Sequence, residues 1–194
     1  MFRIIGRAYD ITEETRAADD LRRKAATDAM TGLCNRAATE ESINAKLREA
    51  GESGCVFFII DIDRFKSIND TLGHPVGDQV IKGFASVLKS LFRSDDIIGR
   101  LGGDEFGVLV HLTPSKGQID LRVDAIVKEV RALSQRMDLG IALTASIGVA
   151  EAPRDGRTFN ELFSNADIAL YRAKESGKDR GVLFEPGMGK LNRK

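Results

Sequence analysis

The sequence predicts an α/β fold in which a central, mainly antiparallel sheet is flanked by helices. Three observations favour this class. Helical and strand-like patterns alternate from residue 28 onward, the run 55–62 is almost wholly apolar, and the strand-like runs 96–101 and 106–112 are joined by a glycine-rich turn. The chain has 194 residues, 42% of them hydrophobic, which is enough for one domain with its own core and a short appendage.

Charge and cysteine content limit the function classes. Lys plus Arg total 29 and Asp plus Glu total 29, a formal charge of zero, so no overall basic field attracts nucleic acid and any phosphate ligand must be held by local groups.

Cys34 and Cys55 lie at no metal-ligand spacing and are expected to be reduced thiols of a cytoplasmic protein. The longest apolar stretch, 56–60, is far shorter than the roughly 20 residues of a membrane span. We expect no membrane contact by this fragment, although a flanking segment of a full-length protein could anchor it.

Residues 1–27 form the expected appendage. Residues 1–10 alternate enough for a strand, and the charged, Ala-rich run 11–27 favours a helix. An apolar stripe at three-four spacing in this helix is interrupted at Glu14. A coiled-coil segment and a solvated linker helix are therefore both open.

The first elements after residue 28 are two helices and a strand. Residues 36–50 have a helical pattern that ends at Gly51 and Gly54. The run 55–62 (CVFFIIDI) is typical of a buried strand. A second helix is expected over 78–92, because its apolar residues recur at the spacing of one helical face.

The second half begins with a hairpin, since the runs 96–101 and 106–112 flank the turn Gly102-Gly103-Asp104-Glu105. The remaining expected elements are a helix at 118–137, a strand at 141–149 whose apolar residues alternate, and a helix at 159–175 with one apolar side.

Two acidic pairs carry the candidate chemistry. Asp61 and Asp63 end the most apolar strand, and their two-residue spacing points both carboxylates to one side of the sheet. Asp104 and Glu105 lie at the hairpin tip. If the two elements are neighbours, the carboxylates converge on a site that suits Mg²⁺ and metal-assisted phosphoryl chemistry. The alternatives are a strand end that emerges into water and a Gly-Gly-Asp turn that serves only the hairpin.

Five ordered blocks of the sequence carry a family resemblance. They are residues 28–36 (DAMTGLCNR), 61–78 (DIDRFKSINDTLGHPVGD), 100–106 (RLGGDEF), 146–149 (SIGV) and 166–178 (ADIALYRAKESGK). Together they resemble the GGDEF family of diguanylate cyclases, enzymes that condense two GTP molecules into cyclic di-GMP and two pyrophosphates. The resemblance implies a fold similar to nucleotidyl cyclase and polymerase palm domains, with the catalytic domain at 28–185 and a C-terminal linker at 186–194.

The resemblance also implies a metal site. Asp61, the backbone carbonyl of Ile62 and Asp104 correspond to its ligands, for Mg²⁺ with Mn²⁺ as an alternative. Asp104 is in addition the implied group that helps to deprotonate the attacking ribose 3′-hydroxyl.

Base recognition is implied for Asn69 and Asp78, with His74 and Phe65 close to the nucleotide. A carboxylate can accept hydrogen bonds from guanine N1–H and its amino group together, so such a site should reject ATP. Asp78 could instead be the N-cap of the expected helix.

Cations are implied around the triphosphate. Lys66 and Arg100 stand at catalytic positions, and Lys174 and Lys178 at substrate-binding positions together with Gly103 and Glu105. Lys178 stands where the family often has Arg, so charge is kept there but bidentate phosphate contact is lost. Taken alone, each cation could equally be a solvated surface group.

Regulation and assembly are implied as well. Arg93 and Asp96 match the inhibitory site for the product, although a surface ion pair at a helix end would give the same pattern. The two-fold symmetric product implies a homodimer for catalysis. Residues 3–21 resemble the end of a PAS sensor domain and its signalling helix, and 183–188 are similar to linkers that lead into an EAL phosphodiesterase domain.

Two rival functions are compatible with parts of this sequence. The first is a catalytically silent module that binds GTP or cyclic di-GMP, against which the complete signature argues. The second is a cyclase with a mixed guanine–adenine product, against which Asp78 argues. A fragment that is inactive because it cannot dimerise without its sensor is a further possibility.

Overall fold

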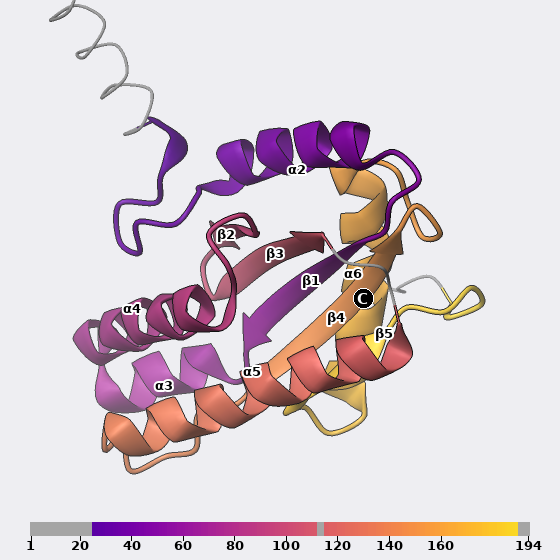
Figure 1. The fold of residues 1–194 in the computed structure, drawn as a ribbon. Coiled ribbons are helices and arrows are strands. Elements are labelled where there is room, and N and C mark those ends of the chain that lie inside the picture. The colour runs from indigo at the N-terminus through magenta and orange to yellow at the C-terminus, as the bar shows by residue number, and fades with distance from the viewer. Residues whose placement is uncertain (1–24, 112–114, 190–194) are drawn as a thin grey trace, which may run out of the picture.

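The structure is a computed structural model that describes residues 25–111 and 115–189 (Figure 1). The expected strand at 1–10 lies outside this range, and so do residues 11–24 of the helix expected at 11–27. Ala25 and Ala26 are helical. Residues 190–194 of the expected C-terminal linker also lie outside the described part.

A five-stranded sheet forms the centre of the domain, in the order β2-β3-β1-β4-β5. The strands are β1 (Cys55–Ile62), β2 (Ile97–Gly102), β3 (Glu105–His111), β4 (Ala145–Ala152) and β5 (Arg180–Leu183). Every neighbouring pair is antiparallel except β4 and β5, which are parallel. The predicted α/β class with a mainly antiparallel sheet is confirmed.

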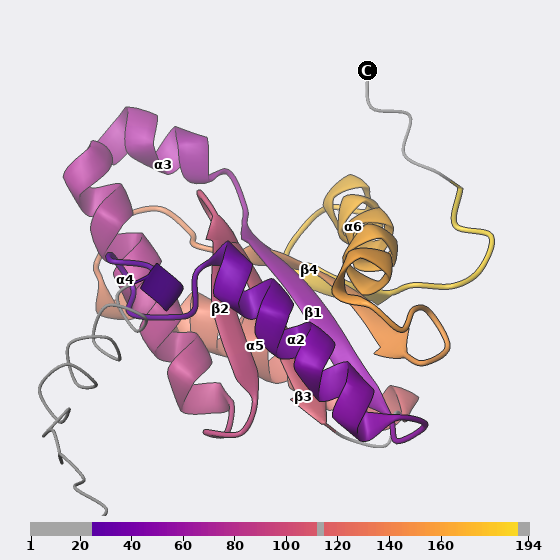
Figure 2. The same ribbon diagram turned by 90° about the horizontal axis from the view of Figure 1, so that it is seen from above.

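Helices cover both faces of this sheet (Figures 1 and 2). They are α2 (Arg36–Ala50), α3 (Phe65–Leu72), α4 (His74–Leu91), α5 (Lys116–Arg136) and α6 (Phe159–Glu175). The side chains of β1 alternate between the two layers. Phe58 and Ile60 join the core under α3, α4 and α5, while Phe57 and Ile59 join the core under α2 and α6. All four are fully buried, so β1 supplies both cores with apolar surface.

Local sequence signals fix the helix starts. The Asn35 side chain accepts a hydrogen bond from the Ala38 N–H at the start of α2. At the start of α6, Thr158 and Glu161 form a reciprocal capping box. These caps satisfy backbone N–H groups that the first turn of a helix cannot pair. Three elements, α2, β1 and α6, have the bounds expected from the sequence.

The region between β1 and α4 differs from the expectation. Residues 65–72 form the helix α3, which the sequence pattern did not predict. The expected helix at 78–92 is α4, and it begins four residues earlier, at His74, with Pro75 in its first turn. The cap of α4 is Gly73. Asp78 therefore lies inside the helix, and its interpretation as an N-cap is wrong.

The last two strands also differ from the expectation. The strand expected at 141–149 is β4, shifted to 145–152. Ile141 and Leu143 pack on the core, but their segment is an irregular turn in which Ser134 accepts from the Leu143 N–H and donates to the Ile141 carbonyl. The short strand β5 was not predicted. The other bounds, those of β2, β3 and α5, agree with the expectation within two residues. In the part of the chain that the structure describes, no helix is both long and apolar enough to span a bilayer.

Candidate active site

The tip of the β2–β3 hairpin lies against the end of β1. Asp61 and Glu105 are register partners on adjacent antiparallel strands. The Ile62 N–H donates a hydrogen bond of 3.3 Å to the Asp104 carbonyl, beyond the last strand pair. The structure thus brings together the two acidic pairs that the sequence placed on separate elements.

Burial and mutual repulsion shape the electrostatics of this cluster. The Lys174 Nζ lies 2.8 Å from Asp61 Oδ2. Burial raises the pKa of Asp61; the Lys174 contact opposes the rise, and Asp104 and Asp63 add to it. Burial also raises the pKa of Glu105, with further contributions from Asp61 and Asp167. Carboxylates held in this way favour the arrival of a cation, and perturbed pKa values of this origin cluster at functional sites.

Asp63 has a different environment from Asp61. It is only 4% exposed. Its oxygens accept hydrogen bonds from the Thr144 hydroxyl at 2.8 Å, the Ser146 hydroxyl at 2.7 Å and the Asp179 N–H at 3.1 Å. Asp63 therefore ties the end of β1 to β4 and to the segment before β5.

The residues present fit a hard cation of the Mg²⁺ type. Among residues 25–111 and 115–189, no group of three His, Cys, Asp or Glu side chains could hold a metal by itself. Mg²⁺ needs only one or two protein carboxylates when phosphates and water complete its octahedron. Asp61 and Asp104, which lie close enough for the charge of Asp104 to raise the pKa of Asp61, meet that requirement. The ligand set stays a prediction.

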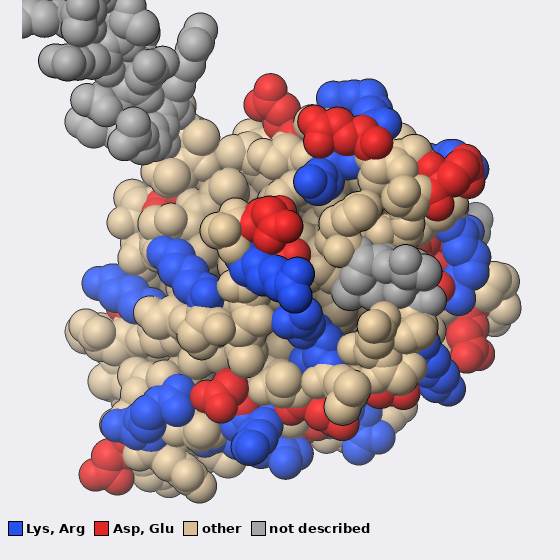
Figure 3. Space-filling model, in the orientation of Figure 1, with Lys and Arg blue, Asp and Glu red and all other residues tan. Residues whose placement is uncertain are grey.

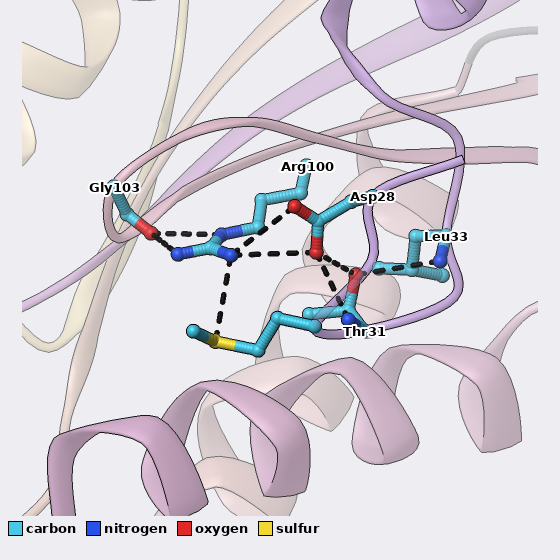
Figure 4. A network of polar contacts seen from close by, with 6 residues as sticks. Asp28, Thr31, Leu33, Arg100 and Gly103 are labelled. Carbon is cyan, nitrogen blue, oxygen red and sulfur yellow. Dashed lines mark hydrogen bonds and ion pairs between the residues drawn. The ribbon is translucent and has the colours of Figure 1, made fainter. Parts of the chain in front are cut away.

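The Arg100 side chain lies between Gly103 of the hairpin turn and Asp28 (Figure 4). Its Nε and Nη2 donate to the Gly103 carbonyl at 2.9 and 2.7 Å, and its Nη1 lies 3.3 Å from both oxygens of Asp28. Asp28 also accepts from the Thr31 N–H at 2.9 Å and the Thr31 hydroxyl at 2.7 Å. Arg100 thus joins the hairpin tip to the loop that precedes α2. Its expected contact with the triphosphate stays a prediction.

The pKa of Asp28 reflects this network. Burial of the carboxyl opposes ionisation, but the Thr31 hydrogen bonds and then the charge of Arg100 outweigh it, so the pKa of Asp28 lies below its ordinary value. The carboxylate form is therefore part of the folded structure at neutral pH.

The candidate base-reading residues lie on a pair of adjoining helices. Asn69 belongs to α3 and Asp78 to α4, and the helices meet at Gly73, whose φ of 86° lies in the left-handed region. Asp78, His74 and Lys66 are exposed, while Asn69 and Phe65 are half-buried. The nucleotide contacts expected of these residues stay predictions.

The remaining substrate-site candidates lie in turns or beside the acidic cluster. Lys174 contacts Asp61, as described above. Lys178 has a φ of 64° and its N–H donates to the Ala173 carbonyl at 3.0 Å, so it belongs to the turn after α6. Gly103 has a φ of 50° and no atom within 4 Å of the position of a Cβ, which leaves the tip of the hairpin open.

Arg93 and Asp96 lie away from the acidic cluster, at the end of α4. The Arg93 N–H donates to Asp96 Oδ2 at 2.8 Å, a turn contact rather than the surface ion pair considered as an alternative. Both residues line a cavity of about 390 Å³. Its other lining residues are Val110, His111, Gln118, Leu121, Arg122 and Ala125.

Arg122 was missed in the sequence, as were the roles of Asp28 and Thr31. Arg122 Nη1 donates to the Leu91 carbonyl at 2.9 Å, and its guanidinium lies 5.2 Å from the Phe92 ring centroid. It lies in the charged helix α5, which contains several arginines, and the spacing of the sequence does not distinguish Arg122 from the others. Asp28 and Thr31 were noted as part of the first resemblance block, but only the fold shows that they contact Arg100.

Acidic and basic side chains are mixed over the face of the molecule shown in Figure 3. This distribution agrees with the formal charge of zero. Local groups such as Lys174 and Arg122 are therefore the means by which the domain could hold phosphate.

Known proteins are similar in sequence to this chain over most of its length. The profile of the family described as "Diguanylate cyclase, GGDEF domain" matches residues 25–180. Cyclic di-GMP phosphodiesterase PdeR of Escherichia coli K12 is 34% identical over 179 residues, which are 92% of this chain and 27% of PdeR. Probable diguanylate cyclase DgcC of the same strain is 38% identical over 157 residues, 79% of this chain and 42% of DgcC. The chain spans less than half the length of these curated relatives.

A solved structure has the same fold. It contains the coiled coil and GGDEF domain of DgcB from Caulobacter crescentus in complex with c-di-GMP. The two chains superpose with a TM-score of 0.79 at 29% identity, over 90% of this chain and 93% of the other.

Proposed function

Because the chain belongs to the family of diguanylate cyclase GGDEF domains, we propose that it condenses two GTP molecules into cyclic di-GMP and releases two pyrophosphates. The observation that carries the proposal is the meeting of Asp61 and Glu105 across β1 and β3, with the Asp104 carbonyl bonded to the Ile62 N–H. Relatives named as diguanylate cyclases support the same reaction class.

The acidic cluster would prepare the nucleophile. Asp61, Asp104 and the Ile62 carbonyl would hold Mg²⁺, which neutralises phosphate charge and lowers the pKa of a bound hydroxyl. Asp104 would accept the proton of the ribose 3′-hydroxyl. The 3′-oxygen then forms a bond to the α-phosphorus of the facing GTP while the bond to pyrophosphate breaks, and the second attack closes the ring in the same way.

Cationic side chains would act on the triphosphate and on the turn. Lys174 would turn from Asp61, which it contacts at 2.8 Å, to the phosphates, and exposed Lys66 would approach them from α3. Arg100 would serve the reaction by holding the Gly103 carbonyl and thereby the backbone beside Asp104. This role differs from a direct phosphate contact.

Guanine would be read by Asn69 and Asp78, with His74 and Phe65 nearby. A carboxylate pairs with the N1–H and amino donors of guanine, which adenine lacks. An ATP molecule in the same place would leave the Asp78 carboxylate and the Asn69 amide without their guanine partners, so selection against it should be strong.

Product would inhibit the enzyme through the cavity beside Arg93 and Asp96. Arg122 from α5 faces this cavity and supplies a second guanidinium, so two arginines could clamp a phosphate or stack on guanine. The Arg93→Ala variant is expected to be less sensitive to cyclic di-GMP.

The active unit would be a homodimer in a cytoplasmic setting. One GTP per domain and a two-fold symmetric product require two domains that face each other. Relatives carry additional domains, and one is named a bifunctional diguanylate cyclase/cyclic di-GMP phosphodiesterase. An N-terminal sensor and a C-terminal EAL domain would accompany this domain in a longer protein.

A silent binding module is the second candidate function. The observation that favours it is that PdeR and NbdA, relatives of this chain, are named cyclic di-GMP phosphodiesterases. In such a protein a GGDEF domain could bind GTP without turning it over.

The test is an incubation of the purified protein with GTP and Mg²⁺, followed by chromatography. Cyclic di-GMP should form, and Asp104→Ala should reduce its formation by at least about a hundredfold, because ligand and base are lost together. Asp124→Ala, which removes an exposed aspartate of α5, is the matched control. Bound GTP that persists unchanged at high protein concentration would favour the binding module instead.

A further inference from the structure

Gly77 in α4 lies directly against the side chain of Asn69 in α3. A Cβ at position 77 would lie 1.9 Å from Asn69 Oδ1, 3.0 Å from Asn69 Cγ and 3.3 Å from Phe65 Cζ. The distance of 1.9 Å is far shorter than any van der Waals contact between a carbon and an oxygen atom. A side chain at position 77 would therefore force the Asn69 side chain to move.

Backbone conformation does not explain this glycine. Gly77 is buried, and its φ is not in the left-handed region that favours glycine. Alanine is preferred over glycine inside helices, since glycine loses more conformational freedom on folding. The close approach of the two helices is therefore the reason that remains.

Packing is also what orients the Asn69 amide. In the described part of the chain, the Asn69 side chain forms no hydrogen bond with another protein group. The amide is thus not committed to a hydrogen bond with a described protein group. Its Oδ1 lies close to where a Cβ of residue 77 would be, so the missing side chain of Gly77 leaves the room that the amide occupies.

We infer that Gly77 is the positioning residue for base recognition: its missing side chain sets the place of the Asn69 amide next to the helix that carries Asp78. This inference rests on the proposed function, because it takes Asn69 as a guanine reader. Its effect is expected on nucleotide affinity, since the acidic cluster lies on β1 and β3 and does not contact Gly77.

The experiment compares the steady-state KM and kcat for GTP of the wild type with those of four variants: Gly77→Ala, Asn69→Ala, Asn69→Ala/Gly77→Ala and Gly83→Ala. Gly83→Ala is the matched control, because Gly83 is also inside α4 and a Cβ there would meet only flexible atoms, Leu133 Cδ1 at 3.0 Å first. Thermal unfolding of each nucleotide-free protein is measured in parallel.

We expect Gly77→Ala to raise KM for GTP roughly tenfold or more, the equivalent of one lost hydrogen bond, with a smaller change in kcat. Gly83→Ala should keep the wild-type KM. In the double variant, Gly77→Ala should add nothing to the effect of Asn69→Ala, because the two act through one contact. A folded Gly77→Ala protein with wild-type KM would overturn the inference, as would effects of the two substitutions that multiply.

Two further outcomes separate folding and function. If Gly77→Ala does not fold, the double variant should fold, because Asn69→Ala removes the clashing atoms; a double variant that also fails to fold contradicts the inference. If the wild type binds GTP but forms no cyclic di-GMP, the proposed function fails alone. The GTP dissociation constant from calorimetry then replaces KM in the same comparison.

Discussion

Asp61 and Asp63 lie two positions apart at the end of β1, but their environments and roles differ. Asp61 lies beside Asp104 and Lys174, and burial raises its pKa. Asp63 is nearly inaccessible and accepts three hydrogen bonds from β4 and the segment before β5. Under the proposed function the first carboxylate is a metal ligand, whereas the second holds the strand end in place.

This difference predicts that the alanine variant of Asp63 loses stability, whereas the alanine variant of Asp61 keeps it. Asp63→Ala leaves three donors without an acceptor and should lower the free energy of unfolding by about 3 kcal/mol. Asp61→Ala loses one ion pair and one buried, repelled charge, so its free energy of unfolding should stay within about 1 kcal/mol of the wild type. Urea unfolding measures both values. An equal loss in the two variants would show that Asp61 is structural as well.

The sequence could place these carboxylates on a strand end and a turn, but it could not separate their roles. Both are aspartates at the same strand end, and the partners of Asp63, namely Thr144, Ser146 and Asp179, distinguish the two. Arg100 is a similar case. The resemblance assigned it to phosphate, whereas its contacts with Gly103 and Asp28 require loops that lie more than 70 positions apart in the chain.

At the scale of elements, the loop before α2 and the hairpin tip form one unit through Asp28 and Arg100. The Arg100 side chain is 14% exposed and that of Asp28 is 23% exposed, so solvent screens this pair only in part. Cys34 extends the contact, since its carbonyl accepts from the Arg100 N–H at 2.9 Å. The turn at Gly103 is thus supported from a segment near the start of the described chain.

Asp28→Asn tests this unit through pH. The variant keeps an acceptor for Thr31 but loses the charge that faces Arg100. The pKa of Asp28 is depressed in the folded protein, so its stabilisation is fully present above the unfolded pKa and is lost as pH falls through the folded pKa. We expect the wild type to be more stable than the variant by about 1 kcal/mol at pH 7.

Thermal unfolding between pH 7 and pH 3 measures this difference. The gap in Tm should be constant down to about pH 5 and narrow once the pH passes below the ordinary aspartate value of 3.8. A gap that widens on acidification would contradict the assigned direction of the shift.

The docking of α6 on β4 depends on Gly148. A Cβ there would lie 2.0 Å from the Ala166 carbonyl oxygen and 2.5 Å from the Leu170 nitrogen. Both are backbone atoms of a helix and cannot turn aside, so Gly148→Ala should cost about 3 kcal/mol or more. Gly117→Ala, where a Cβ meets nothing within 4 Å, should instead stabilise α5 slightly. Chemical denaturation of both variants is the measurement, and equal stabilities would refute the close approach.

Elements with strong local patterns were predictable and short ones were not. The bounds of α2 follow from its helical pattern and the glycines after it, those of β1 from its apolar run, and those of α6 from its one apolar side. The helix α3 has eight residues and the strand β5 has four, too few for a period to show. The segment 141–144 alternates like a strand, yet the Ile141 carbonyl and the Leu143 N–H bond to the Ser134 side chain. The Thr144 carbonyl accepts from the Asp63 N–H, just beyond the end of β1. Tertiary contacts therefore decided the cases in which the local pattern failed.

At the scale of the whole molecule, the domain carries two separate candidate sites. The acidic cluster lies at the β2–β3 hairpin tip, and the cavity of Arg93, Asp96 and Arg122 lies at the end of α4 beside α5. The strand β2 connects the two, since it runs from just after Asp96 to the hairpin tip. A product bound at the second site would therefore act on the arrangement of domains or along β2.

The requirement for two domains leads to a mixing prediction. Asp104→Ala protomers should keep the fold, because the Asp104 contact with Ile62 uses the backbone carbonyl. They should therefore pair with wild-type protomers.

In a mixed pair only one of the two 3′-hydroxyls is activated, so no ring can close. With a ninefold excess of the variant, about one tenth of the wild-type protomers face another wild-type protomer, and cyclic di-GMP formation per wild-type molecule should fall roughly tenfold. The same excess of Asp63→Ala, if unfolded, should leave the rate unchanged. Chromatography of the product at a fixed wild-type concentration measures the effect, and a rate that does not respond to the Asp104→Ala protomers would mean that each domain completes the reaction alone.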